Sequence, residues 1–250
     1  MGPRQPAGAG GELTDVSTGR RKTLATQLTW LGHGSWLIRA GAHRILLDPF
    51  LDDSPVAPLK SGEVEADFIL VSHGHFDHVA DTAKVANRTG AMVISNFEIC
   101  QWLDNQGVAN THGMNIGGGH DFPFGRVKMT IAHHTSMLPD GSNGGDAAGF
   151  LVHFPEGNVY FACDTGLFYD MKLIGAAGIT LAALPIGDNF TMGPDDALEA
   201  VKLLEPKRVV PVHTKTWPLI DQDAEAWAER VRRETAAEPV LLAPGESLTL

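Results

Sequence analysis

The segment V-S-H-G-H-F-D-H, from Val71 to His78, concentrates side chains that bind transition metals. Four ligand-type residues fall within six positions: His73, His75, Asp77 and His78. Imidazole and carboxylate groups suit Zn, Mn, Fe or Ni, and a tight turn could aim the first pair at one ion and the second pair at another. The alternative, a solvated His-rich loop, gives no reason for such a density of ligands. The segment therefore predicts part of a site for two ions.

One loop cannot complete two metal sites, so further ligands are expected at the ends of other strands. Ligand-type residues stand just past three more apolar runs: His133-His134, Asp164 and His213. Any one of them alone would more often be a capping or surface residue, but three at matching positions favour a shared site. Successive side chains of a strand point to opposite faces, which favours His134 as the ligand and leaves His133 for packing or for contact with a ligand.

These candidates need strands that bring them to one edge of the fold. Apolar runs predict strands at residues 27–31, 36–39, 44–47, 68–71, 93–94, 126–132, 148–154, 158–162, 179–184, 208–212, 240–242 and 247–250. Helical spacing predicts helices at 80–89, 97–106, 194–204 and 222–235. Both halves of the chain run from strands into strand–helix alternation, and no linker divides them. We therefore expect one α/β domain over residues 24–250, with sheets packed together inside and helices outside.

Composition excludes several classes of protein. Residues 1–23 are rich in Gly, Pro and polar groups and are expected to form a flexible N-terminal tail. They hold no apolar segment of a secretory signal, and no run in the chain approaches the roughly 20 apolar residues of a membrane helix. The two cysteines, Cys100 and Cys163, give no disulfide framework, so a cytoplasmic location is expected. The 30 acidic residues against 19 basic ones give a net charge of −11, which argues against a general nucleic-acid binder.

The run His73-Gly74-His75-Phe76-Asp77-His78 resembles the H-x-H-x-D-H signature of the metallo-β-lactamase superfamily. A later His, an Asp before Thr-Gly and a final His follow in that family's order, so the resemblance covers nearly the whole chain from Leu24. Three other segments are similar to compact bacterial metal-dependent hydrolases related to ascorbate-6-phosphate lactonase: Leu31-Gly32-His33-Gly34-Ser35, Leu47-Asp48-Pro49 and Gly187-Asp188-Asn189-Phe190-Thr191-Met192. The resemblance implies a four-layer αβ/βα sandwich with a dinuclear site at one edge of its two sheets.

The resemblance also implies a division of the ligands. One ion takes His73, His75 and His134; the other takes Asp77, His78 and His213, and Asp164 bridges both. True lactamases that share the motif lack the bridging Asp, and others use Cys as a ligand. In this chain Cys163 stands beside Asp164 on the other face of its strand, where a buried small residue is the more natural interpretation. Drug resistance is therefore not the expected function.

The implied chemistry is attack by a metal-bridged hydroxide on a polarised substrate. Two ions lower the pKa of a shared water to about 7, which supplies a nucleophile at neutral pH. Asp164 would set the spacing of the ions, and Asp77 would bind one ion and orient the nucleophile. His33 is the candidate proton donor to the leaving group, with a packing or ligand-supporting role equally open. Asp48, Asp188 and Asn189 are candidates to hold ligating imidazoles, although Asp48 could equally start a turn before Pro49.

The sequence favours a hydrolase of a small carbonyl substrate: a lactone, ester or thioester. The alternative is a phosphodiesterase acting on nucleic acid or a phosphorylated metabolite, which the acidic charge disfavours. A di-iron redox or sensing protein would need a partner domain that this chain does not show. Two divalent ions are the expected cofactors, with Zn ahead of Mn, Fe or Ni, and a homo-oligomer stays open. Pocket shape is expected to depend on loops 50–66, 135–146 and 214–221, and Trp217 is placed to border the pocket.

Overall fold

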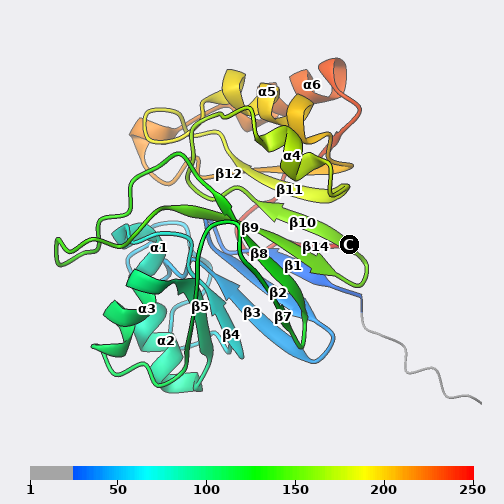
Figure 1. Cartoon of the computed structure of the whole chain (residues 1–250). Coiled ribbons are helices and arrows are strands. Elements are labelled where there is room, and N and C mark those ends of the chain that lie inside the picture. Colours follow the sequence, from blue (N-terminus) through cyan, green and yellow to red (C-terminus); the bar gives the residue numbers. More distant parts are fainter. Residues whose placement is uncertain (1–24) are drawn as a thin grey trace, which may run out of the picture.

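Two mixed β-sheets lie face to face in the computed structural model, which describes residues 25–250 (Figure 1). Within these residues each sheet has seven strands. The first sheet runs in the order β14 (Ser247–Thr249), β1 (Gln27–Trp30), β2 (Trp36–Ala40), β3 (His43–Leu47), β4 (Phe68–Leu70), β5 (Met92–Asn96) and β6 (Thr111–Met114). The second runs β13 (Glu238–Pro239), β12 (Arg208–Val212), β11 (Ile179–Pro185), β10 (Gly157–Phe161), β9 (Ala148–Phe154), β8 (Gly125–Ile131) and β7 (Gly119–Phe122).

Helices cover the outer face of each sheet (Figure 1). On the first sheet these are α1 (Phe76–Val79), α2 (Thr82–Thr89) and α3 (Phe97–Asp104); on the second they are α4 (Met171–Gly175), α5 (Pro194–Leu204) and α6 (Ala224–Glu234). The predicted four-layer αβ/βα sandwich is therefore confirmed. Among the helices of residues 25–250, none has the length and apolarity that crossing a membrane requires. The predicted tail at residues 1–23 lies outside the described residues.

Helix α5 shows how local sequence sets an element of the outer layer. Pro194 occupies the first turn, where its missing N–H costs no hydrogen bond, and Asp195 and Asp196 stand at the positive end of the helix dipole. Four apolar side chains at helical spacing are buried against the second sheet: Ala197, Leu198, Val201 and Leu204. The predicted bounds of 194–204 are those observed, and the helix predicted at 222–235 is α6.

Strand direction brings the candidate ligands to one edge. Strands β3, β4 and β5 are parallel to one another, as are β10, β11 and β12. Strand β1 shares the direction of β3 through the antiparallel β2, and β8 shares that of β10 through β9. Loops after the carboxyl ends of these strands therefore gather at one end of each sheet, which is where ligand sites of layered α/β folds form.

Some sequence-based boundaries are wrong. The strand predicted at 240–242 is replaced by β13 at Glu238–Pro239, and Val240 keeps only a backbone bond from its N–H to the Val209 carbonyl at 2.8 Å. The helix predicted at 80–89 begins at Thr82, because the His/Asp motif forms a helical turn of its own, α1. The sequence does not predict β6, β7 or α4, since the first two lack apolar alternation and α4 is a single short turn.

The space between the sheets is filled by large apolar side chains, and Trp36 is one of the most buried. It is 1% exposed and its ring lies edge-on to Phe161 of the facing sheet at 6.0 Å. We expect Trp36→Ala to lower the free energy of unfolding by about 3–5 kcal/mol, because the cavity adds to the lost burial. Urea unfolding at fixed metal concentration measures it. Trp102→Ala, at a half-buried tryptophan of α3, is the control, and an equal loss in both variants would contradict the packing argument.

Candidate metal centre

All of the predicted metal-site side chains meet at the edge where the strands end. His73 and His75 follow β4, Asp77 and His78 lie in α1, and the second sheet supplies the rest from the ends of β8, β10 and β12: His134, Asp164 and His213. Both sheets therefore contribute, and neither could form the cluster alone.

Three imidazole nitrogens converge in the first part of the cluster. His75 Nδ1 lies 3.1 Å from His73 Nε2 and 3.2 Å from His134 Nε2. The other nitrogen of His75, Nε2, lies 3.2 Å from the hydroxyl of Thr135, which fixes the ring. His133 turns away from this group, as the alternation argument predicts, and its exposed ring stacks on Phe168 at 4.9 Å.

Asp164 occupies the middle of the cluster. Its Oδ2 atom lies 3.0 Å from His213 Nε2, 3.4 Å from His78 Nε2, 3.6 Å from His134 Nε2 and 3.9 Å from His73 Nε2. The carboxylate is 4% exposed. One oxygen thus faces histidines of both predicted ion sites, which is the position that a bridging ligand needs.

The second part of the cluster contains buried nitrogens without hydrogen-bond partners. The ligand atoms of His33, Asp77, His78 and His213 lie within 4.8 Å of one another. His78 Nε2 and both ring nitrogens of His213 are buried and make no hydrogen bond of acceptable geometry, although Asp164 Oδ2 is near. Unpaired buried polar atoms are costly, and a cation that takes their lone pairs removes the cost. The donor set therefore fits a bound transition metal.

Asp48 fixes the orientation of two of these histidines. Its carboxylate is fully buried and accepts hydrogen bonds from the Ser72 backbone N–H at 2.7 Å, the Ser72 hydroxyl at 2.6 Å and His78 Nδ1 at 2.9 Å. Since the Ser72 hydroxyl proton points to Asp48, its oxygen accepts from His73 Nδ1 at 2.9 Å. Both rings therefore carry their proton on Nδ1 and turn Nε2 toward Asp164. The sequence suggested Asp48 for such contact, but it gave no sign of Ser72.

We expect Asp48→Asn to weaken metal binding by about 10- to 100-fold, because the amide cannot accept all three of these hydrogen bonds. Competition with a chromophoric chelator measures the affinity. Asp67→Asn is a matched control: Asp67 pairs with Arg44 at the partly exposed start of β4, 2.9 Å away, and touches no cluster residue. Equal affinity in the Asp48 variant and the wild type would contradict this role.

His33 lies behind Asp77 and is fully buried. Its Nε2 is 3.0 Å from Asp77 Oδ2, its Nδ1 is 2.8 Å from the hydroxyl of Thr216, and its ring lies 4.1 Å from that of His213. Burial, with His213 next in effect, lowers the pKa of His33 to about 4. A neutral ring then donates from Nε2 to Asp77 and accepts from Thr216. This geometry favours support of Asp77 over proton donation to a leaving group.

Electrostatics keep the Asp164 carboxylate ionised and the rings of His73, His75 and His134 neutral. Burial lowers the pKa values of His73, His75 and His134. Burial opposes ionisation of Asp164, but His213 and His78 outweigh it and hold the pKa of Asp164 well below its usual value. At His78 burial acts to lower the pKa, yet Asp164 and Asp48 outweigh it and raise that pKa well above its usual value. A metal ion that binds His78 must displace the proton from its ring. The affinity of the site for metal therefore falls as the pH falls.

The backbone at the site adopts conformations that sequence reasoning missed. Four non-glycine residues at or shortly after the ends of β1, β3, β10 and β12 have left-handed backbones: His33 at φ 52°, Asp48 at φ 45°, Cys163 at φ 54° and His213 at φ 52°. Such strain clusters where a fold must aim side chains at a functional site. At Gly34 the backbone approaches the His78 ring so closely that a side chain would not fit. A Cβ there would lie 2.8 Å from Cε1 of His78. The L-G-H-G-S segment thus packs a glycine directly against a predicted ligand.

Cys163 packs in the core between the sheets rather than facing the cluster's nitrogens. Its thiol is buried, and its sulfur lies 3.7 Å from the Phe161 carbonyl oxygen. Burial raises the pKa of this thiol well above its usual value. A protonated, core-facing thiol agrees with the sequence interpretation. Asp188 belongs to none of the groups of potential metal ligands among the described residues, and its carboxylate accepts from the Asn189 N–H at 2.8 Å.

A cleft of about 520 Å³ opens over the cluster. Its floor holds predicted ligands, and its walls come from α1, the loop after β11 and the 3₁₀ turn η1 (Pro218–Ile220). The lining residues are His75, Phe76, Asp77, His134, Thr135, Asp164, Phe190, His213, Trp217 and Leu219. Trp217 borders the pocket as predicted. The sequence singled out neither Phe190 nor Leu219 as a pocket residue, because loop conformation decides their exposure.

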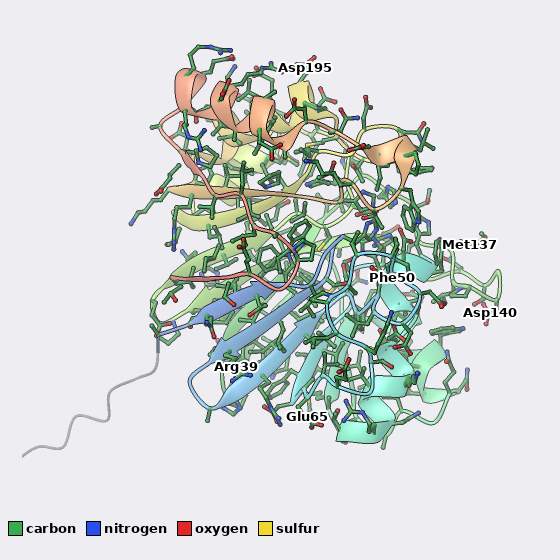
Figure 2. The ribbon with its side chains drawn as sticks, turned by 180° about the vertical axis from the view of Figure 1, so that it is seen from behind. Arg39, Phe50, Glu65, Met137, Asp140 and Asp195 are labelled. Carbon is green, nitrogen blue, oxygen red and sulfur yellow. The ribbon has the colours of Figure 1, made fainter. Side chains whose placement is uncertain are left out.

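The 135–146 loop touches the site at its base only. Thr135 lines the cleft, and the Ser136 hydroxyl accepts from the Gly74 N–H at 3.0 Å, which ties the loop to the His/Asp motif. Farther out, Met137 and Asp140 lie on the part that projects from the body of the molecule (Figure 2). There the Asp140 carboxylate accepts from the Trp102 indole at 2.7 Å, so the projecting part is held to α3.

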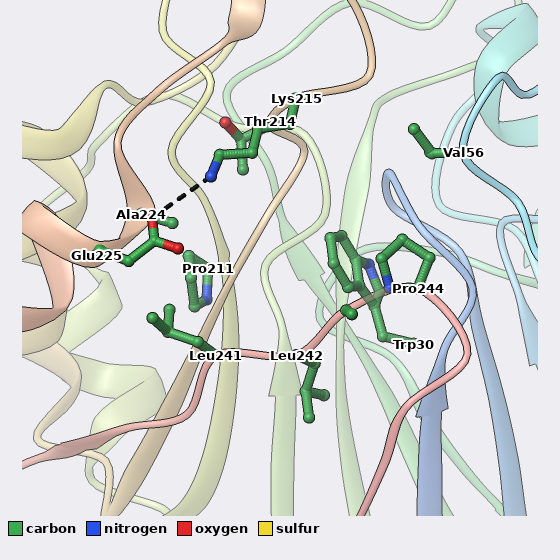
Figure 3. Close-up of a pocket in the computed structure, with 11 residues that line it drawn as sticks. Trp30, Val56, Pro211, Thr214, Lys215, Ala224, Glu225, Leu241, Leu242 and Pro244 are labelled. Atoms are coloured by element: carbon green, nitrogen blue, oxygen red, sulfur yellow. Dashed lines mark hydrogen bonds and ion pairs between the residues drawn. The ribbon is translucent and has the colours of Figure 1, made fainter.

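A second hollow, of about 380 Å³, lies beside the end of β12 (Figure 3). Its walls are mostly apolar, and an ion pair of 3.4 Å between Lys215 and Glu225 closes one side. None of the predicted ligands lines it; the residues that do include Trp30, Pro211, Leu241, Leu242 and Pro244. The cleft described above, not this hollow, therefore gives access to the cluster.

Comparison with known proteins agrees with this architecture. Residues 43–214 match the family described as a beta-lactamase superfamily domain. A UPF0173 metal-dependent hydrolase of Heliobacterium modesticaldum is 47% identical over 231 residues, 89% of this chain and 97% of that protein. One from Thermus thermophilus is 47% identical over 224 residues, 90% and 99% of the two chains. The solved structure of Igni18, a metallo hydrolase from Ignicoccus hospitalis, has a TM-score of 0.83 at 32% identity and covers 91% of this chain and 99% of its own.

The fold and the His/Asp cluster together define a member of the beta-lactamase superfamily. Within that superfamily, the chain belongs to the UPF0173 metal-dependent hydrolases. The predicted superfamily and the predicted enzyme class, a metal-dependent hydrolase, are therefore both confirmed.

Proposed function

We propose that this protein is a dinuclear metal-dependent hydrolase of a small carbonyl substrate, such as a lactone, ester or thioester. The observation that carries the proposal is the position of Asp164. Its Oδ2 atom lies between the two groups of histidines, at 3.0 Å from His213 and 3.6 Å from His134. A single-ion site would not need histidines on both sides of one carboxylate oxygen.

The proposed ligands divide as the two groups of side chains do. One ion would be held by His73, His75 and His134, the other by Asp77, His78 and His213, with Asp164 shared. Zn is the favoured metal, and Mn, Fe and Ni are alternatives because the same donor set accepts them. When bound, two such ions would supply a nucleophile at neutral pH and would polarise the substrate's oxygen.

Side chains of the protein orient the proposed ligands and give the substrate access to them. The cleft over the cluster admits a small molecule and leaves Asp77 accessible at its floor. Asp48 holds the rings of His73 and His78 in the tautomer that turns Nε2 inward. His33 holds Asp77 by a hydrogen bond from behind, and its burial keeps it away from a leaving group.

We expect His33→Asn to lower kcat/KM by about 10- to 100-fold, since Asp77 loses the donor that fixes its orientation. The pH–rate profile separates this role from proton donation. A positioning role predicts the same profile shape at a lower plateau, whereas loss of a proton donor removes the limb on the alkaline side. If the His33→Asn variant lacked the alkaline limb, His33 would be the general acid and the positioning role would be wrong.

A substrate panel tests the proposal directly. Metal-loaded protein is assayed with lactones, esters and thioesters beside phosphodiesters such as bis-(p-nitrophenyl) phosphate. Turnover of a carbonyl substrate that depends on added metal supports the proposal. Faster turnover of the phosphodiester would favour the phosphodiesterase instead, and no turnover of any of them by protein shown to hold metal would overturn the carbonyl assignment.

A further inference from the structure

The walls of the cleft carry apolar side chains that are unusually exposed. Phe76 is 56% exposed, Phe190 53% and Leu219 60%, and Trp217 beside them is partly exposed. They come from three segments, α1, the loop after β11 and the η1 turn, so local sequence does not explain their grouping. Exposed apolar side chains that converge on one hollow indicate a binding surface for apolar groups.

One wall is held in place from behind by a fully packed aromatic ring. Phe50 is 1% exposed and lies 5.8 Å from the ring of Phe76 and 6.0 Å from that of Trp217. The rings of Phe76 and Trp217 are themselves 6.2 Å apart, and Trp217 lies edge-on to His33 at 5.0 Å. The aromatic wall is therefore backed by a buried ring, Phe50.

The cleft offers no cationic side chain to an anionic substrate. Among the described residues that line it, the charged side chains are Asp77 and Asp164, and neither Lys nor Arg is present. Lys215 is only two residues from Trp217 in the sequence. It lines the second hollow instead, and its ammonium group pairs there with Glu225 at 3.4 Å. Sites that recognise phosphate usually supply Arg or Lys in addition to metal.

We propose that the cleft selects an uncharged substrate with a hydrocarbon chain or ring next to its scissile carbonyl. The hydrocarbon part lies against Phe76, Phe190, Trp217 and Leu219 while the carbonyl reaches the cluster. This specificity rests on the hydrolase function proposed above. The cleft volume of about 520 Å³ lies within the range of small-molecule sites.

Calorimetric titration with methyl ketones, which are uncharged carbonyl compounds without a hydrolysable bond, tests the selectivity without requiring turnover. Acetone, 2-pentanone, 2-heptanone and 2-nonanone are titrated into metal-loaded protein, with alkyl phosphates of matching chain length in parallel. Each added methylene is expected to lower Kd by about three- to fourfold until the chain outgrows the cleft. For the p-nitrophenyl esters of acetic, butanoic, hexanoic and octanoic acid, kcat/KM is expected to rise by the same factor per methylene.

A matched pair of leucines separates the cleft from general surface effects. Leu219→Ser should flatten the dependence on chain length, because Leu219 forms part of the wall. Leu173→Ser changes another exposed leucine, 73% accessible on α4 and outside the cleft, and should leave the dependence on chain length unchanged. Equal slopes for both variants would overturn the assignment of this wall.

The outcomes also separate the two proposals. A Kd independent of chain length, or tighter binding of the alkyl phosphates, overturns the apolar selectivity even if esters are hydrolysed. A clear dependence on chain length without hydrolysis of any ester, thioester or lactone overturns the carbonyl hydrolase function and leaves the selectivity standing.

Discussion

Replacing Asp164 with Asn is expected to lower kcat/KM by about 10³-fold, which corresponds to ~4 kcal/mol of transition-state stabilisation. The carboxylate oxygen that lies 3.0–3.9 Å from four histidines would lose its charge, and an amide ligates metals poorly. Bound metal should fall to about one equivalent or less, because the shared ligand is gone. Steady-state kinetics and elemental analysis of the same preparation measure both effects.

Asp195→Asn is the control for this substitution. Asp195 lies in the first turn of α5, its side chain is 88% exposed, and it pairs with Arg230 at 2.6 Å. The same chemical change there should leave metal content and rate near those of the wild type. An Asp164→Asn protein that keeps both its metal and its rate would remove the bridging role from the account.

Removal of metal by a chelator has the second large expected effect. Activity should fall to background and return when metal is added back. The melting temperature should fall by roughly 5–10 °C per ion, because an ion at 100 times its Kd adds about 2.7 kcal/mol of stability and a domain of this size shifts by about 2–4 °C per kcal/mol. Without ions, the buried nitrogens of His78 and His213 return to having no hydrogen-bond partner.

Chelation of Asp164→Asn is the matched comparison. The variant holds less metal, so the chelator should lower its melting temperature by less than it lowers that of the wild type. Calorimetric scans at one protein concentration record both shifts. If exhaustively chelated wild-type protein kept its melting temperature and its rate, while elemental analysis showed no metal, the cluster would have neither a structural nor a catalytic ion.

The ligand-type residues were predictable because each follows a local pattern. His73 to His78 come after a buried strand, and His134, Asp164 and His213 come after three more. Strand direction then brings such positions together without any knowledge of side-chain packing. Alternation along the chain was enough to favour His134 over His133, and the structure places the His133 ring on Phe168 instead.

What sequence could not supply depends on tertiary contacts. The Asp48–Ser72–His73 chain of hydrogen bonds joins the ends of β3 and β4, and nothing local in S-H-G-H marks Ser72 as an acceptor. The support of Asp77 by His33 joins residues 44 positions apart. Edge strands β6 and β7 have mixed sequences, T-H-G-M and G-H-D-F, whose pairing is set by their neighbours in the sheets.

The left-handed residues at the strand ends show the same limit. The sequence predicts Asp48 and His213 as candidates for the site. Their left-handed backbone conformation is imposed by the turns around them and is not predictable from residue type. The apolar walls of the cleft were likewise out of reach, because Phe190 and Leu219 would read as ordinary loop residues without the loop conformations that expose them.

The metal content of wild-type protein tests the central claim most directly. The protein is purified without chelator or added metal, and elemental analysis gives both the identity and the stoichiometry of bound ions. The account predicts about two equivalents of a divalent transition metal per chain, with Zn favoured. A chain that binds no metal, even after supplementation with Zn, Mn, Fe or Ni, would contradict it.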